Sequence, residues 1–324
     1  MLGKGAFGEV WAGTWKVDGK KYALKKVSRA PIIECGMQKQ LRLEVKLMAQ
    51  LDHPNIIKCL GWWEDELNLW LMLEFAAKGQ LFNLVKRYGK VSEGNAVFYI
   101  ADLCKALDYM HHFDNGKKQI LHRDIKGENI LIMADGHSKL ADFGWAGINQ
   151  GNRDRKTYCG TPEYLAPEVV LQQFQTYAVD TWAIGILFYE LLCGVTPFKP
   201  VMGDRSMDDN IRHKRVPKSL AITPQAYQFI NFILEKDPKM RPTVTQVMDH
   251  KFWKRYPAIK FDKWQPDASI LRMPEPAKRK VVSPNSQPSK INQGTPQFSP
   301  GQANMPGPPA PTGQPKTYDQ PKPE

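Results

Sequence analysis

Residues 122–129 read HRDIKGEN, and they carry the densest set of charged and polar side chains with a recognisable chemical pattern in the chain. Within it, Asp124 is followed two residues later by Lys126 and five residues later by Asn129. This set supplies a base or orienting carboxylate, a cation that neutralises phosphate and an oxygen ligand for a hard metal ion. The stretch therefore predicts chemistry on a phosphorylated cosubstrate.

Two short motifs follow further along the chain. Asp142-Phe-Gly comes after Asp124, beyond two apolar runs around a turn at 134–136, and Ala166-Pro-Glu168 comes later. A carboxylate such as Asp142 is a natural ligand for Mg²⁺. Each tripeptide alone is weak evidence, but their order and spacing together are highly specific.

A glycine-rich run opens the chain. Gly3, Gly5 and Gly8 form a G-x-G-x-x-G-x-V pattern that ends at Val10. Without a Cβ, such a turn can bring its backbone close to phosphate groups. A dinucleotide-binding βαβ unit would need a helix directly after the glycines, whereas residues 9–15 read as a strand. The dinucleotide interpretation therefore fails.

Lys25 follows Gly8 along the chain, in a predicted strand, and can offer its charge to the phosphates of a nucleotide. Other lysines lie close to it in the sequence, so the alternative is that Lys25 is an ordinary exposed lysine without a role in binding. The spacing of Lys25 to Gly8 before it and to Glu44 after it singles it out. Glu44 lies in a helix predicted over 37–51, from which its carboxylate can position the ammonium by an ion pair.

The order of the predicted elements indicates an α+β architecture. Strand-like runs fill the first part of the chain, at 9–15, 21–27, 56–62 and 67–74. Mainly helical patterns follow residue 79, at 95–113, 178–192, 224–235 and 243–250. We therefore expect a small β-rich lobe, a larger helical lobe and a cleft between them.

Composition excludes several classes of protein. The net charge is +12, but no zinc finger, RNP motif or long basic stripe supports direct nucleic-acid binding. The five cysteines never form a CxxC pair, which argues against a disulfide framework or a structural zinc site. No apolar run is long enough to span a bilayer, and no secretory signal opens the chain. We expect an intracellular protein without a membrane partner.

Prolines are concentrated at the end of the chain, where more than half of the 25 fall after position 264. Residues 257–324 therefore read as a Pro-rich, disordered tail. Its sequence 306–311, PGPPAP, suggests a ligand for proline-recognition domains, although a passive solvated tail is the simpler interpretation.

Together these motifs resemble the signature of eukaryotic protein kinases over residues 1–256. The resemblance is greatest to the Aurora group, because Trp145 directly follows Asp142-Phe-Gly. Residues 40–45, 51–57 and 156–161 also resemble the corresponding sequences of Aurora kinases. The sequence of residues 161–168 is common to many kinase groups. A basophilic kinase of the calmodulin-dependent or cyclic-nucleotide-related groups is therefore one alternative. A pseudokinase-like scaffold is another.

The resemblance implies a bilobal protein kinase fold, with an N-lobe 1–73, a hinge 74–79 and a C-lobe 80–256. ATP would lie in the cleft and pass its γ-phosphoryl group to a Ser or Thr hydroxyl. Asp124 would orient that hydroxyl and accept its proton, and Lys126 would offset charge on the moving group.

Around the nucleotide, the resemblance implies further roles. Lys25 would hold the phosphates, Glu44 would position Lys25, and Asn129 and Asp142 would bind Mg²⁺. Leu73 would be the gatekeeper of the adenine pocket. The full set expected to bind ATP and Mg²⁺ is Leu2, Gly3, Gly5, Gly8, Val10, Ala23, Lys25, Leu73, Glu74, Phe75, Ala76, Glu128, Asn129, Leu131 and Asp142.

Regulation and substrate choice follow from the same resemblance. Thr157 is the predicted regulatory phosphosite, and Arg123 would receive its phosphate. Thr161 is expected to bridge Asp124 and Lys126. Glu128 and Glu190 occupy positions that contact arginines upstream of the target residue in basophilic kinases, although ordinary solvated carboxylates are the alternative.

Two scaffold residues also match the family. Asp180 resembles the structural aspartate of a central C-lobe helix, and Arg241 resembles the partner of Glu168. Only Met1 and Leu2 precede Gly3, where the family has a longer strand, so we expect the recorded start to be internal to a longer protein.

The resemblance finally suggests a cellular setting. It implies an activating protein on the N-lobe and a role in mitotic or cell-cycle regulation. The expected location is the cytoplasm or nucleus, with the spindle or centrosome among the candidate sites.

Overall fold

The structure is a computed structural model that describes residues 1–4, 8–16, 18–114, 116–149, 160–204, 206–259 and 261. These residues all belong to one unit, Met1–Pro276. The predicted tail, 257–324, lies almost entirely outside the described residues, as does Thr157.

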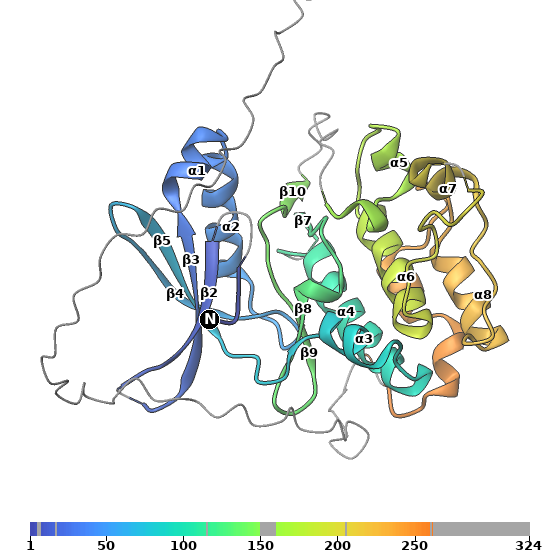
Figure 1. The fold of residues 1–324 in the computed structure, drawn as a ribbon, viewed down its shortest axis with the longest axis horizontal. Helices are drawn as coiled ribbons and strands as arrows, with labels where there is room; N and C mark the ends of the chain where they lie inside the picture. The colour runs from blue at the N-terminus through green and yellow to red at the C-terminus, as the bar shows by residue number, and fades with distance from the viewer. Residues whose placement is uncertain are drawn as a thin grey trace, which may run out of the picture. The chain divides into compact units, whose positions relative to one another are not determined.

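A five-stranded antiparallel sheet forms the first part of the fold (Figure 1). In sheet order, its strands are β1 (Gly3–Lys4), β2 (Gly8–Thr14), β3 (Lys21–Ser28), β5 (Asn68–Glu74) and β4 (Cys59–Glu64). Lys25 is paired with Val10 on β2 and Leu71 on β5. The alternation of side chains puts Ala23, Lys25 and Val27 on the same face of β3.

The fourth strand begins later than predicted, at Cys59 rather than at residue 56. The reason is a contact that the local sequence does not reveal. Ile56 forms a parallel bridge with Leu140, and the backbone N–H of Ile57 donates to the Leu140 carbonyl at 2.9 Å. These residues therefore join the sheet region to the helical part instead of extending β4.

Two helices accompany the sheet. α2 (Gln38–Gln50) confirms the helix predicted over 37–51 and buries Glu44, Val45, Leu47 and Met48. α1 (Arg29–Glu34) was not predicted, because so short a helix does not show a helical period.

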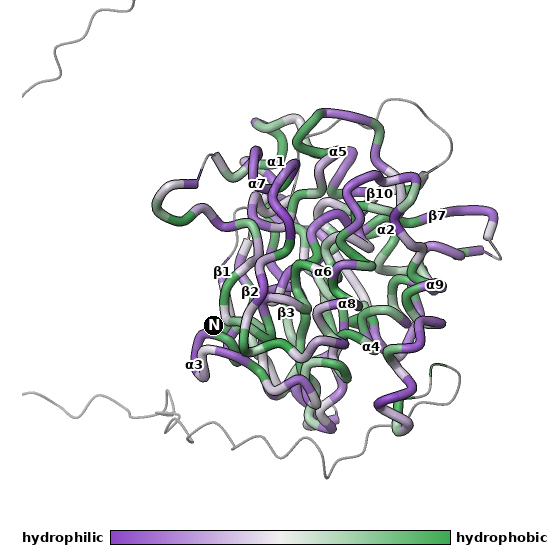
Figure 2. Tube along the Cα trace, turned by 90° about the vertical axis from the view of Figure 1, so that its right-hand side faces the viewer, coloured by the Kyte–Doolittle hydropathy of each residue, from purple (hydrophilic) through white to green (hydrophobic). Residues whose placement is uncertain are grey.

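Helices dominate from residue 82 onward, as predicted. They are α3 (Phe82–Tyr88), α4 (Glu93–His111), α5 (Pro167–Val170), α6 (Ala178–Cys193), α7 (Met207–His213), α8 (Pro224–Ile233) and α9 (Val244–Met248). Side chains of Ser92, Thr223 and Thr243 cap the N-termini of α4, α8 and α9. α6 is buried along nearly its whole length and contacts α4 and α8. Figure 2 shows hydrophobic stretches along these helices, which form the core of this part.

Short strands carry the predicted catalytic residues. β6 (Gly79–Gln80), β8 (Ile130–Ile132) and β9 (Ser138–Leu140) form a small sheet, and β7 (Gln119–Leu121) pairs with β10 (Gly147–Asn149). β8 and β9 confirm the predicted apolar pair around residues 134–136. Because β8 begins directly after Asn129 and β9 ends two residues before Asp142, the antiparallel pairing brings those two residues to the same end of the hairpin.

The described residues contain neither a membrane-spanning helix nor a disulfide. No helix among them is both long and apolar enough to cross a membrane. Cys35, Cys59, Cys104 and Cys193 are free thiols, and Cys159 lies outside the described residues.

Candidate active site

A cavity of about 240 Å³ lies between the five-stranded sheet and the β6–β8–β9 region. The predicted residues that line it are Leu2, Gly3, Val10, Ala23, Lys25, Leu73, Glu74, Ala76, Glu128, Asn129, Leu131 and Asp142. Gly79, the last residue of the predicted hinge, also lines it, and the residues that line it without having been predicted are Met48, Ile57, Gln80, Asn83 and Ala141. Of these, Met48 could have been predicted from the sequence, because it lies one helical turn after Glu44 and therefore on the same side of the helix.

Three predicted nucleotide-site residues are not placed at this cavity. Gly5 lies outside the described residues, and Gly8 and Phe75 are not part of the lining. Gly8 has another reason to lack a side chain, because a Cβ there would lie 2.0 Å from the carbonyl oxygen of Lys26. Glycine at this position therefore permits the close pairing of β2 with β3.

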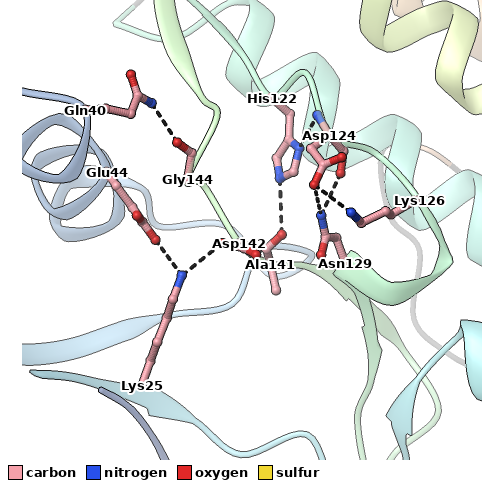
Figure 3. Close-up of polar contacts among 10 residues, drawn as sticks. All are labelled: Lys25, Gln40, Glu44, His122, Asp124, Lys126, Asn129, Ala141, Asp142 and Gly144. Carbon is pink, nitrogen blue, oxygen red and sulfur yellow. Dashed lines mark hydrogen bonds and ion pairs between the residues drawn. The ribbon is translucent and has the colours of Figure 1, made fainter. Parts of the chain in front are cut away.

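Lys25 joins two carboxylates that come from distant parts of the chain (Figure 3). Its Nζ lies 2.7 Å from Glu44 Oε1 on α2 and 2.9 Å from Asp142 Oδ1. Burial alone would lower the pKa of Lys25, but the two carboxylates outweigh it and raise that pKa. Lys25 in turn lowers the pKa of Asp142. The ion pair expected between Lys25 and Glu44 is thus present, and it extends to Asp142.

Asp124 is the centre of a second group of polar contacts. Lys126 Nζ lies 2.9 Å from Asp124 Oδ2 and donates to Thr161 Oγ1 at 2.8 Å. The Thr161 hydroxyl donates to Asp124 Oδ1 at 3.0 Å, so the predicted Thr161 bridge is confirmed. Asn129 Nδ2 donates to the Asp124 carbonyl oxygen at 2.7 Å and to Oδ2 at 3.0 Å. This commits the nitrogen of the Asn129 amide to Asp124 and leaves its oxygen for a cation.

The loop that carries Asp124 is held by α6. The fully buried Asp180 accepts hydrogen bonds from the backbone N–H of His122 at 2.9 Å and of Arg123 at 2.8 Å. Its Oδ2 also lies 3.0 Å from His111 Nε2. Although burial opposes ionisation, hydrogen bonds lower the pKa of Asp180. These bonds hold Arg123 in a left-handed backbone conformation, with φ of 69°.

His122 connects this loop with the segment after β9. Its Nε2 lies 3.2 Å from the Ala141 carbonyl oxygen (Figure 3). Its ring packs edge-on against buried Phe143, with the ring centroids 5.1 Å apart. Burial lowers the pKa of His122, so the ring is neutral at physiological pH. Asp142, which follows Ala141, also has a left-handed backbone, with φ of 64°.

A further contact fixes the first residue of the predicted hinge. The Glu74 carboxylate accepts two hydrogen bonds from Lys139 Nζ on β9, both at 2.8 Å, and one from the backbone N–H of Lys58 at 2.7 Å. Glu74 is therefore tied to the hairpin that leads to Asp142. No local pattern indicates this contact, because it joins residues 65 positions apart.

The predicted scaffold pair is confirmed. The Arg241 guanidinium binds both oxygens of Glu168, at 2.6 and 2.9 Å, and both side chains are fully buried. This pair joins α5 to the segment before α9.

Glu190 on α6 is half-buried, and the Tyr164 hydroxyl donates a hydrogen bond to it. Glu190 is therefore a partly buried carboxylate with a hydrogen-bond donor beside it. Burial raises the pKa of Glu190, and the neighbouring carboxylates of Glu128 and Glu163 raise it further. Because the charges of Glu128 and Glu190 repel one another, a cationic ligand between them would stabilise their ionised forms.

The oxygens near the cavity suit a hard divalent cation. The Asp142 carboxylate is kept ionised by Lys25, and the amide oxygen of Asn129 is turned away from Asp124. Among the described residues, no three His, Cys, Asp or Glu side chains form a metal cluster. Two protein oxygens fit a Mg²⁺ ion that also keeps water and substrate phosphate ligands.

Comparisons with known proteins match this arrangement. The sequence model of the family described as protein kinase domain matches residues 1–253. The Aurora kinase of Schizosaccharomyces pombe is 38% identical over 255 residues, which cover 79% of this chain and 70% of that protein. The Aurora kinase of Saccharomyces cerevisiae is 39% identical, covering 77% and 66%. The serine/threonine-protein kinase Aurora-1 of Arabidopsis thaliana is 36% identical, covering 77% and 83%.

Proposed function

Since the chain belongs to the protein kinase domain family and is an Aurora-like serine/threonine protein kinase, we propose that it phosphorylates Ser or Thr in a basic context. One observation supports the assignment of these residues to catalysis and nucleotide binding. Asp124 contacts both Lys126 and Asn129, and Asn129 lines the same cavity as Lys25 and Asp142.

The proposed roles follow from these contacts. Asp124 orients the substrate hydroxyl and accepts its proton while the hydroxyl oxygen bonds to the γ-phosphorus and the bond to ADP breaks. Lys126 offsets the charge on the transferred group, and Lys25 holds the phosphates that remain on the nucleotide. Asn129 and Asp142 are the residues that would hold Mg²⁺, which neutralises phosphate charge when bound.

For substrate choice, we propose that Glu128 and Glu190 bind an arginine two residues before the target. The support is the half-buried Glu190 with its raised pKa and the nearby carboxylate of Glu128, a pair that a guanidinium would stabilise.

Steady-state kinetics on a pair of peptides, with Arg or Ala at that position, test this proposal. We expect KM to be about tenfold lower for the Arg peptide, a difference of ~1.4 kcal/mol. Glu190→Gln should reduce this preference, and Glu66→Gln, at an exposed position, should keep it. Equal KM values for the two peptides on the unmodified protein would contradict the proposal.

For activation, we propose that phosphate on Thr157 binds Arg123. Thr157 lies outside the described residues, so the support comes from Arg123, whose Nε is buried and has no hydrogen-bond partner among the described residues. Phosphate would add about −1.5 to −2 charge and supply acceptors for this guanidinium.

Mass spectrometry of the protein expressed alone tests both the site and its origin. We expect phosphate on Thr157 in the unmodified protein and none in Lys25→Met, if the kinase modifies itself. Thr157 phosphate on the Lys25→Met protein would contradict autophosphorylation. Phosphatase treatment that left activity unchanged would contradict the activating role.

An activating partner on the N-lobe is also proposed, and a cavity supports it. A groove of about 570 Å³ lies between α1, α2 and β4. Its apolar lining includes Ile32, Leu41 and Trp62, and basic side chains of Arg42 and Lys46 border it. This combination fits an acidic peptide segment with large apolar side chains.

Peptides of this composition can be titrated against the protein by calorimetry. Binding that is lost with Trp62→Ala and weakened by salt is expected. Equal binding of peptides in which the acids are replaced by lysine would contradict the proposal.

The cellular role is a proposal by likeness to the named relatives. We propose a function in mitotic or cell-cycle regulation, in the cytoplasm or nucleus, with the tail available to proline-recognition domains. Imaging of the tagged full chain through the cell cycle tests this role. An unchanged distribution and activity at every stage would contradict it.

A further inference from the structure

One side of α2 contacts both the lysine of the nucleotide site and the segment that follows Asp142. Gln40 and Glu44 lie four residues apart on α2, so their side chains lie on the same side of the helix. Glu44 accepts a hydrogen bond from Lys25, while Gln40 Nε2 donates to the carbonyl oxygens of Gly144 and Ala146, both at 2.9 Å. Figure 3 shows Gln40 pointing from α2 toward Gly144.

This contact requires a hydrogen-bond donor at the end of the Gln40 side chain. Both neighbours of the Gln40 side chain are carbonyl oxygens, so the NH₂ group must face them, and its two hydrogens suffice for the two acceptors. A carboxylate at the same place would be repelled by both oxygens, and an apolar side chain would leave both without this donor.

The segment that Gln40 holds begins in a strained conformation. Asp142 has φ of 64°, Phe143 is fully buried, and Ala146 is almost fully buried just before β10 pairs with β7. The two carbonyls bound by Gln40 flank Trp145 on either side. A strained backbone persists only where its surroundings hold it, and Gln40 supplies part of that restraint.

We propose that Gln40 is a positioning residue for phosphoryl transfer, which holds the backbone after Asp142 when α2 is in place. This role rests on the proposed kinase activity of the same site. Through Glu44 the helix places Lys25, and through Gln40 it places the chain that carries Asp142. α2 therefore assembles both sides of the Lys25–Asp142 ion pair at once.

Three replacements of similar length separate a donor role from simple packing. Gln40→Met removes the donors, Gln40→Glu replaces them with acceptors, and Gln40→Lys keeps donors. We expect Gln40→Met to lower kcat about tenfold, equivalent to about 1.4 kcal/mol in the barrier. Gln40→Glu should lower kcat further and Gln40→Lys should restore part of it. KM for ATP should change less than about threefold, because Lys25 and Glu44 are untouched.

Hydrogen–deuterium exchange of the nucleotide-free protein supplies a measurement independent of activity. Amides in residues 142–149 should exchange faster in Gln40→Met than in the unmodified protein, because the restraint on this segment is lost. Lys39→Met on the exposed side of α2 and Gln225→Glu on α8 are the controls, and both should match the unmodified protein. Thermal unfolding midpoints verify that each variant is folded.

Two results would overturn the proposal. One is a Gln40→Met protein with unchanged kcat and unchanged exchange in residues 142–149. The other is equal kcat for the Met, Glu and Lys variants, because a packing role alone does not distinguish donors from acceptors. An unmodified protein that transfers no phosphate would instead count against the kinase activity, while the exchange measurement would still test the restraint by Gln40.

Discussion

The loop around Asp124 and the nucleotide side of the sheet are held by different kinds of contact. Asp180, fully buried in α6, binds two backbone N–H groups of the loop. Lys25 is held instead by side chains from two other elements, and one of them, Asp142, is 51% exposed. Backbone contacts with a buried core persist whenever the helical part is folded, whereas the contact of Lys25 with Glu44 exists only while α2 is in place. One half of this site is therefore built into the core, and the other half depends on the position of one helix.

Loss of Asp180 should have the largest effect on stability. Asp180→Ala leaves the buried His122 N–H, the partly buried Arg123 N–H and the His111 ring without their acceptor, so we expect a loss of about 3–5 kcal/mol in the free energy of unfolding. Urea unfolding followed by circular dichroism measures it. Asp208→Ala, at an exposed position of α7, should change stability by less than about 0.5 kcal/mol. Similar stability of the two variants would remove the distinction between the two halves of the site.

Loss of Lys25 should act on catalysis more than on stability. We expect Lys25→Met to lower kcat by about 10²–10³, because a charge that stabilises phosphate is removed. Its stability loss should be smaller than that of Asp180→Ala, because Lys25→Met leaves one buried group, Glu44, without its partner while Asp142 can turn to water, whereas Asp180→Ala removes the acceptor of three groups. Peptide phosphorylation and urea unfolding of the same preparations provide both numbers. Equal stability losses in the two variants would show that the Lys25 contacts are as much a part of the core as Asp180.

The pH dependence of substrate binding should be a smaller effect. Burial raises the pKa of Glu190, so the carboxyl is neutral below that pKa and charged above it. Attraction for an arginine at −2 should therefore strengthen as pH rises through that pKa, and KM for that peptide should fall, by up to about tenfold. The ratio of KM between the Ala and Arg peptides measures this effect and cancels other titrations. A ratio with the same pH dependence in Glu190→Gln would assign the titration to another group.

The contact between Glu74 and Lys139 should give the smallest effect. Lys139→Met frees the Glu74 carboxylate from a partly exposed ion pair, so we expect a stability loss of about 1 kcal/mol or less. KM for ATP should rise about two- to threefold, because Glu74 lines the cavity. Lys118→Met, which breaks an exposed pair with Asp114, is the matched control. An unchanged KM for ATP in Lys139→Met would mean that Glu74 needs no support from β9.

Part of the site could be predicted because spacing alone sets its geometry. Asp124, Lys126 and Asn129 share one short loop, so their proximity followed directly from the motif, and the Thr161 bridge followed from the family pattern. Contacts that join distant segments have no local signature and could not be predicted in this way.

Three such contacts shape the site. The amide of Gln40, the Lys139–Glu74 pair and the hydrogen bond from Tyr164 to Glu190 each depend on elements that pack together only in the folded chain. The late start of β4 has the same cause, since Ile56 and Ile57 pair with Leu140.

The most direct test of this mechanism is transfer of labelled γ-phosphoryl from ATP to a serine peptide with arginine at −2, together with ATP binding by calorimetry. We predict that the unmodified protein labels the serine. Asp124→Asn should still bind ATP with similar affinity but lose kcat by about 10³ or more, because only the group that orients and deprotonates the hydroxyl has changed. An Asp124→Asn protein that labels the peptide at the unmodified rate would contradict the mechanism. So would an unmodified, folded protein that binds ATP and labels nothing.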